Sequence, residues 1–138
     1  MNGSIPLSYR FLLKHGQTWH TGKHVIDAMY SEKQECFKNA LWYALNNNLD
    51  YVEGWAVSGD LPPFEHAWCV DSMNNIHDPT WDNGHDYFGA IFNPEYILFH
   101  VTKSSCYGIF GNVWHLNNME ELMDYLEKGL SIRWKSRN

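Results

Sequence analysis

Two short apolar segments in the middle of the chain organise the rest of the sequence: Glu65-His66-Ala67-Trp68-Cys69-Val70-Asp71 and Ile76-His77-Asp78-Pro79-Thr80-Trp81. They predict two strands, residues 66–70 and 75–81, that form a hairpin around a turn at residues 71–74. Such a hairpin places one histidine and one aspartate on neighbouring strands. A carboxylate beside an imidazole is the usual means of fixing the tautomer and orientation of a general base.

A candidate nucleophile, Cys36, stands near the head of the clearest helical pattern in the chain. We expect this helix to begin near Ser31, which is a good N-cap, and to stop at the asparagines of residues 46–48. Its apolar positions recur at three and four residues and define one buried face: Phe37, Ala40, Leu41, Ala44 and Leu45. A helix N-terminus and a nearby imidazole both favour the reactive thiolate form of a cysteine.

The remaining segments predict an α+β fold, with the Cys36 helix packed on an antiparallel sheet and a helix near the C-terminus. The C-terminal helix should be capped by Asn118 and end at Gly129. The other expected elements are an edge strand at residues 5–13, a loop at 15–24, a helical turn at 25–30, strands at 51–57, 87–92 and 96–101, and a loop at 103–112.

Length and charge limit the classes of function. The 138 residues fit one domain, residues 1–138, and the formal net charge of −6 argues against nucleic acid as a partner. The longest apolar runs are far too short to cross a membrane, so no membrane partner is expected. Three cysteines cannot all pair with one another, and the polar start has no apolar leader, which favours a cytoplasmic protein with free thiols.

Each of the three candidate residues also has an ordinary structural explanation. A free cysteine often packs like a small hydrophobic residue, a lone histidine can be a satisfied core group, and Asp-Pro often forms a turn. Strand periodicity helps to choose among the cysteines, because it puts Cys69 on the face opposite His66. Cys106 lies in a glycine-flanked loop with no helix to activate it. The combination of Cys36, His66 and Asp78 is therefore the favoured set.

Zinc binding is the main alternative use of these residues. The spacing of His66 and Cys69 is ligand-like, and Cys36 or Cys106 would add further ligands, but the sequence has no second closely spaced pair. His20 and His24 are four residues apart in a segment whose glycines and threonines disfavour a helix. We expect no metal and no other cofactor.

The motifs resemble those of a known family. His66-Ala67-Trp68, followed by Asp78-Pro79-Thr80-Trp81 and preceded by Tyr51-Val52-Glu53-Gly54-Trp55 and a cysteine heading a helix, is similar to the core of transglutaminase-like proteins of the papain-like superfamily. The resemblance covers roughly residues 34–81 and keeps the order nucleophile, histidine, aspartate. It implies a papain-like core, a thioester at Cys36, His66 as base and Asp78 as its orienting group.

The resulting expectation is a cysteine-dependent amide hydrolase or acyltransferase that acts on a peptide or a small amide. Gln34 and Tyr30 are the candidates for a second oxyanion-hole donor beside the Cys36 backbone N–H, and Trp68 and Trp55 are the candidates for substrate contact. The alternative is a non-catalytic module that keeps the same fold and binds a ligand or a protein. The short chain is also typical of phage-type accessory proteins.

Overall fold

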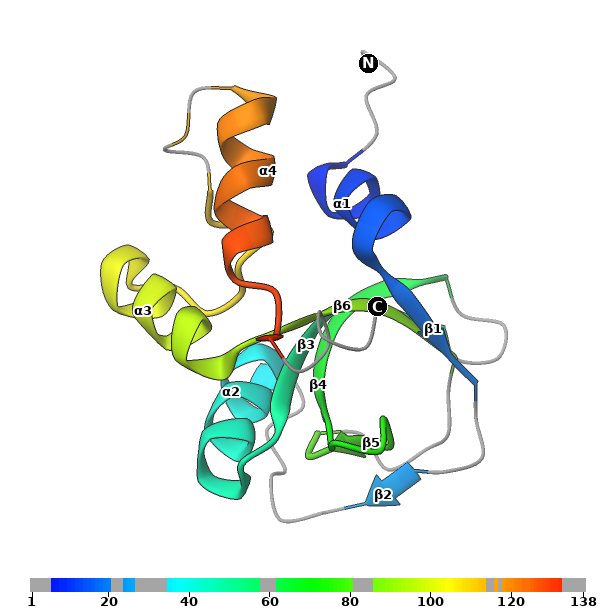
Figure 1. Ribbon diagram of the computed structural model, residues 1–138. Coiled ribbons are helices and arrows are strands. Elements are labelled where there is room, and N and C mark those ends of the chain that lie inside the picture. Colours follow the sequence, from blue (N-terminus) through cyan, green and yellow to red (C-terminus); the bar gives the residue numbers. More distant parts are fainter. Residues whose placement is uncertain are drawn as a thin grey trace.

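The computed structural model describes residues 6–20, 24–26, 35–57, 62–80, 86–113, 116 and 118–132. Within these ranges the chain has an α+β fold, as predicted (Figure 1). The elements in chain order are α1 (Leu7–His15), β1 (Gln17–Trp19), β2 (His24–Ile26), α2 (Cys36–Asn47), β3 (Asp50–Val57), β4 (Phe64–Val70), β5 (Ile76–Asp78), β6 (Asp86–Phe92), α3 (Pro94–Ser104) and α4 (Met119–Lys128).

The strands form one sheet in the order β1-β6-β3-β4-β5-β2. Every neighbouring pair is antiparallel except β2 and β5, which run parallel. Figure 1 shows that the sheet is strongly curled, with β5 and β2 turned in below the long central strands. The predicted hairpin of the two central segments is confirmed, because β4 pairs with β5 across the turn at residues 71–74.

The period of two along the strands separates two apolar clusters. The side that we term the helix face carries Tyr51, Ala67, Cys69, Ala90 and Phe92, which pack on buried residues of all four helices. The opposite side, inside the curl, we term the inner face; it carries Trp19, Val52, Trp68, Tyr87 and Ile91. All the helices of the described chain therefore contribute to the cluster on one side of the sheet.

Helix α2 has the apolar face that its periodicity predicts. Ala40, Leu41 and Ala44 are completely buried against the sheet. The helix ends at Asn48, whose left-handed backbone (φ 54°) makes it the C-cap, as expected for asparagine at a helix end. The described part of the helix starts at Cys36, and the predicted N-cap Ser31 lies outside the described residues.

Four predicted elements are wrong. Residues 7–15 form helix α1 and not an edge strand, because the buried side chains are Ser8, Phe11 and Leu12, which share a helix face. Residues 94–104 form helix α3 where a strand was expected at 96–101. Residues 15–24 are not simply a loop, because β1 pairs there with β6, and residues 24–26 form strand β2 where a helical turn was expected from residue 25.

The C-terminal helix α4 has the predicted N-cap. The Asn118 side chain accepts a hydrogen bond from the backbone N–H of Glu121 at 2.9 Å. Gly129 is the C-cap, but its φ of −86° is right-handed and not the left-handed conformation expected of a C-terminal glycine. No helix within the described ranges has the length and apolar character needed to cross a membrane.

Two glycines face each other at the centre of the curl. Gly54 of β3 is in register with Gly89 of β6. A Cβ atom on Gly89 would lie 2.7 Å from Cη2 of Trp68, so the indole ring occupies the space that a side chain would need. This close approach seats Trp68 in the inner face beside His66.

Candidate active site

Cys36 is the first residue of α2, where the backbone N–H groups of the first helical turn have no partners within the helix. Glu35 precedes it as the N-cap and makes no side-chain capping bond. The thiol is free and the residue is 8% exposed. The thiol therefore lies at the positive end of the helix dipole.

His66 lies on β4 with its ring on the inner face, almost completely buried. Its imidazole is surrounded by the rings of Phe64, Trp68 and Tyr87, with centroids 5.8, 5.9 and 6.1 Å away. Nε2 is 2.7 Å from Oδ2 of Asp78, and the ring also shares a hydrogen bond with the Cys36 side chain. Since Asp78 occupies Nε2, Nδ1 is the nitrogen left to exchange a proton with the thiol.

These contacts determine the charge of His66. Burial alone lowers the pKa of the imidazole, but the hydrogen bonds to Asp78 and Cys36 outweigh it and raise the pKa to about 9. The ring is therefore an imidazolium at neutral pH. A protonated imidazole between a carboxylate and a sulfur stabilises a thiolate on that sulfur.

Asp78 is fully engaged at the end of β5. Its Oδ2 accepts the bond with His66 and a second bond, at 3.0 Å, from the hydroxyl of Tyr87. Its Oδ1 accepts the backbone N–H of Thr80 at 2.9 Å. The Thr80 hydroxyl accepts a bond from Asn39 Nδ2 at 3.1 Å, which ties the end of β5 to the first turns of α2. Helix α2 and the Asp78 carboxylate are thus held together by side chains.

The structure brings Cys36, His66 and Asp78 together, but the other predicted site residues do not all lie beside them. Trp68 is completely buried, where it stacks on His66 and is not accessible to a substrate. Trp55 lies on the helix face at the wall of a pocket and is partly exposed. The predicted oxyanion donors Gln34 and Tyr30 lie outside the described residues.

The other cysteines and carboxylates near the site have separate partners. Cys69 is buried on the helix face and donates to the carbonyl of Ala40 at 3.1 Å. Asp71 pairs with His77 at 2.9 Å and not with His66. Cys106 is exposed. Among the described residues, no three histidine, cysteine, aspartate or glutamate side chains come together as a metal site would need.

Sequence reasoning missed Tyr87, Thr80 and Asn39 as site residues. Thr80 and Asn39 carried a signal, because Thr80 belongs to the motif around Asp78 and Asn39 follows Cys36 by one helical turn. Tyr87 carried none, since only the curl of the sheet brings β6 to the Asp78 carboxylate.

A second buried carboxylate, Glu53, lies on the helix face. It accepts the Tyr51 hydroxyl at 2.5 Å and the backbone N–H groups of Ile109 and Phe110 at 2.9 to 3.1 Å. Burial raises its pKa despite these bonds. The loop that it holds also contacts α2, because Gly108 lies against the ring of Phe37, the residue after Cys36.

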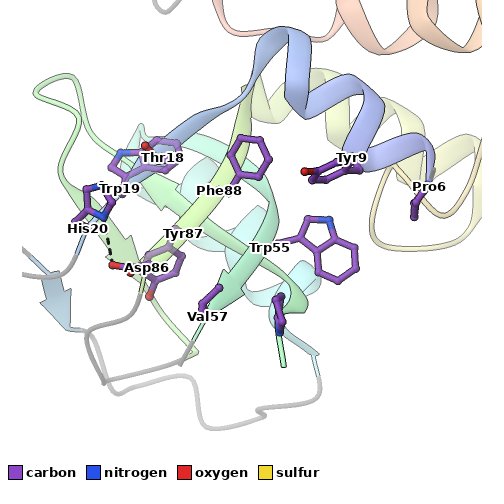
Figure 2. A pocket seen from close by; sticks show the side chains of 11 residues that line it. Pro6, Tyr9, Thr18, Trp19, His20, Trp55, Val57, Asp86, Tyr87 and Phe88 are labelled. Carbon is purple, nitrogen blue, oxygen red and sulfur yellow. Dashed lines mark ion pairs between the residues drawn. The ribbon is translucent and has the colours of Figure 1, made fainter. Parts of the chain in front are cut away.

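An aromatic pocket lies between α1 and strands β1, β3 and β6 (Figure 2). Its volume is about 540 Å³. Its walls are built mainly by Pro6, Tyr9, Trp19, Trp55, Tyr87 and Phe88. Cys36, His66 and Asp78 do not line it, and Tyr87 is the residue that touches both the pocket and the Asp78 carboxylate.

Comparisons of the chain with models of protein families, with curated proteins and with solved structures found no match.

Proposed function

We propose that this protein is a cysteine-dependent amide hydrolase or acyltransferase with a papain-like, transglutaminase-like core. Cys36 is the nucleophile, His66 its proton partner and Asp78 the orienting carboxylate. The observation that supports this proposal most directly is the position of the His66 ring, which is hydrogen-bonded to Asp78 on one side and to Cys36 on the other. That is the geometry of a nucleophile, a base and a third group that fixes the base.

The reaction follows from where the protons lie. His66 holds the proton of the Cys36 thiol, and the thiolate attacks the carbonyl carbon of an amide to form a tetrahedral adduct. The imidazolium then gives its proton to the leaving nitrogen as the C–N bond breaks, which leaves a thioester on Cys36 and a neutral His66. Water or an amine attacks the thioester and His66 takes the proton of that nucleophile. The C–S bond then breaks, which releases the product and restores the Cys36 thiolate beside the His66 imidazolium.

The oxyanion of the adduct would be stabilised at the start of α2. The backbone N–H of Cys36 points along the helix axis at its positive end and serves as one donor. Gln34 or Tyr30 remains the proposed second donor. The proposed substrate is a peptide or a small amide in the cytoplasm, and no nucleic acid, membrane or cofactor takes part.

Selective alkylation tests the nucleophile. At pH 6, brief iodoacetamide treatment of the folded protein should modify Cys36 faster than Cys69 and Cys106, because only the thiolate reacts appreciably. Exposure alone predicts the opposite order, since Cys106 is exposed and Cys36 is buried. Mass mapping gives the three rates. Preferential labelling of Cys106 would mean that Cys36 is an ordinary core residue.

A binding module with the same fold is the second candidate, and the observation that favours it is the low exposure of Cys36. A covalent adduct trapped on Cys36 from a cell extract separates the two functions, because its mass reports an acyl group. Cys36→Ala serves as the control. An enzyme gives an acyl adduct only with the wild-type protein, whereas a binding module gives none with either.

A further inference from the structure

The described walls of the aromatic pocket offer carbon surfaces almost exclusively. Both indole N–H groups in its wall are used elsewhere: Trp55 donates to the Ser8 hydroxyl at 3.4 Å, and Trp19 donates to the Asn74 side chain at 3.2 Å. These two residues therefore contribute the carbon surface of their rings to the pocket wall. The ring of Tyr9 stands nearly perpendicular to that of Phe88, at 77° with 6.4 Å between centroids, so the wall is formed by rings in more than one plane.

The charged residues among the described lining lie together at one corner of the pocket. His20 Nδ1 and Asp86 Oδ1 lie 3.4 Å apart, and both side chains are mostly exposed (Figure 2). The charges of His20 and Asp86 cancel when His20 is protonated, and no lysine or arginine is among the described residues that line the pocket. Among these described lining residues, an anionic ligand would find no cationic partner other than a histidine already paired with a carboxylate.

We propose that this pocket is a binding site for a planar, uncharged apolar molecule or group of one or two rings. Its volume of about 540 Å³ falls within the range of small-molecule sites. Flat rings bury their faces against Trp55 and Phe88 with favourable aromatic contacts. A sugar of similar size is disfavoured, because its hydroxyl groups would lose water and find few partners on these walls.

The site does not depend on the proposed catalytic function. The three residues of the proposed triad do not line the pocket, and the shared residue, Tyr87, turns its hydroxyl to Asp78. A Cys36→Ala variant should therefore bind a pocket ligand as tightly as the wild type. Loss of ligand binding in the pocket and loss of Cys36 reactivity can therefore be observed independently of each other.

Indole is a suitable probe because it is planar, uncharged and soluble. Titration of the ¹⁵N-labelled full chain, followed through its tryptophan side-chain N–H resonances, should show saturable shifts of Trp19 and Trp55 with a dissociation constant on the order of 1 mM or below. Glucose at the same concentrations should leave these resonances in place. Saturable shifts located at Trp42 instead would overturn the proposal, because that exposed residue lies on α2, outside the pocket.

Two variants locate the binding. Trp55→Ala removes a wall and should weaken indole at least tenfold, with Trp42→Ala as the matched control. Because Trp55 also holds α1 through Ser8, Val57→Asp supplies a second test: it puts a charge at a partly exposed pocket position, and its control is Ile132→Asp. The proposal fails if folded Val57→Asp binds indole as well as the wild type does, or if indole causes no saturable change in the wild type.

Discussion

Glu53 and Asp78 are two buried carboxylates on opposite faces of one sheet, and their partners differ in kind. Glu53 accepts from a tyrosine hydroxyl and two backbone N–H groups, none of which changes its charge near neutral pH. Asp78 accepts from a tyrosine hydroxyl, one backbone N–H and an imidazole that is itself in contact with a thiol. We infer that Glu53 acts by accepting hydrogen bonds from buried donors, whereas Asp78 acts on the His66 imidazole through its negative charge.

Removing the acceptors at Glu53 should have the largest effect. Glu53→Ala leaves the N–H groups of Ile109 and Phe110 and the Tyr51 hydroxyl without partners and opens a cavity, so we expect a loss of about 3–5 kcal/mol in the free energy of unfolding. Glu53→Gln should recover most of it, because an amide oxygen still accepts both N–H groups. Urea titration measures both. Equal losses in the two variants would show that Glu53 depends on its charge after all.

The pH dependence of the free energy of unfolding distinguishes the His66–Asp78 pair on the inner face from Glu53 on the helix face. A pKa raised by folding means that the folded state holds protons more tightly, so stability falls as pH rises between the unfolded and folded pKa values. For His66 this window runs from about 6.5, the unfolded value, to about 9, with a total loss on the order of 3 kcal/mol. The raised pKa of Glu53 gives a second, more acidic decline that begins near 4.5.

Urea unfolding at a series of pH values should therefore show two declines in stability. Glu53→Gln removes the acidic decline and leaves the one between pH 6.5 and 9. Asp78→Asn does the reverse, since it removes the charge that raises the pKa of His66. A wild-type stability that stays constant from pH 6.5 to 9 would contradict the imidazolium assignment.

The same carboxylate-to-amide change should be chemically costly at Asp78. Asp78→Asn should leave the fold nearly intact but slow the alkylation of Cys36 at pH 6 at least tenfold, because an amide does not stabilise the imidazolium that supports the thiolate. Asp71→Asn is the matched control, since Asp71 pairs with His77. If both variants react at the wild-type rate, Asp78 is a turn residue and the triad loses its third member.

The smallest effect is expected at Tyr87. Its hydroxyl draws negative charge from the Asp78 oxygen that His66 also uses, so Tyr87→Phe should raise the pKa of His66 by about half a unit, a change of about threefold in its protonation equilibrium. An NMR titration of the His66 ring measures this shift. A Tyr87→Phe variant that unfolds more easily but keeps the wild-type titration would show a packing role alone.

The sequence predicted the elements in which local pattern and burial agree. Helix α2 was predicted because its apolar residues repeat at three and four residues. Strands β3, β4 and β6 were predicted because short runs of apolar residues lie between turn signals. Residues 7–15 have an alternating pattern as well as a helical one, and the alternating positions Tyr9 and Leu13 turned out to be exposed. At α3, Asn93, Pro94 and Glu95 were available as helix-start signals, but the apolar run that follows resembles a strand.

The site likewise combines residues that local motifs predict with contacts that depend on the tertiary fold. Cys36, His66 and Asp78 could be chosen because each lies in a short motif whose chemistry is local. The bond from the Tyr87 hydroxyl to Asp78 depends on the curl of the sheet. The loop held by Glu53 lies 56 residues further along the chain, and no local pattern encodes that contact. The aromatic pocket was not predicted either, since it requires α1 to be a helix packed beside β6.

The glycine pair at the centre of the curl restricts how this sequence can vary. A side chain at Gly89 would displace the ring of Trp68, and that ring stacks directly on His66. The position of the imidazole therefore depends partly on the absence of a Cβ atom at Gly89, two strands away in the sheet. A mutational scan for altered reactivity would find Gly89 intolerant, although the residue touches no candidate substrate and offers no functional group. During neutral evolution, Gly89 should therefore stay unchanged. A larger residue at this position becomes tolerable only after Trp68 has been replaced by a smaller one.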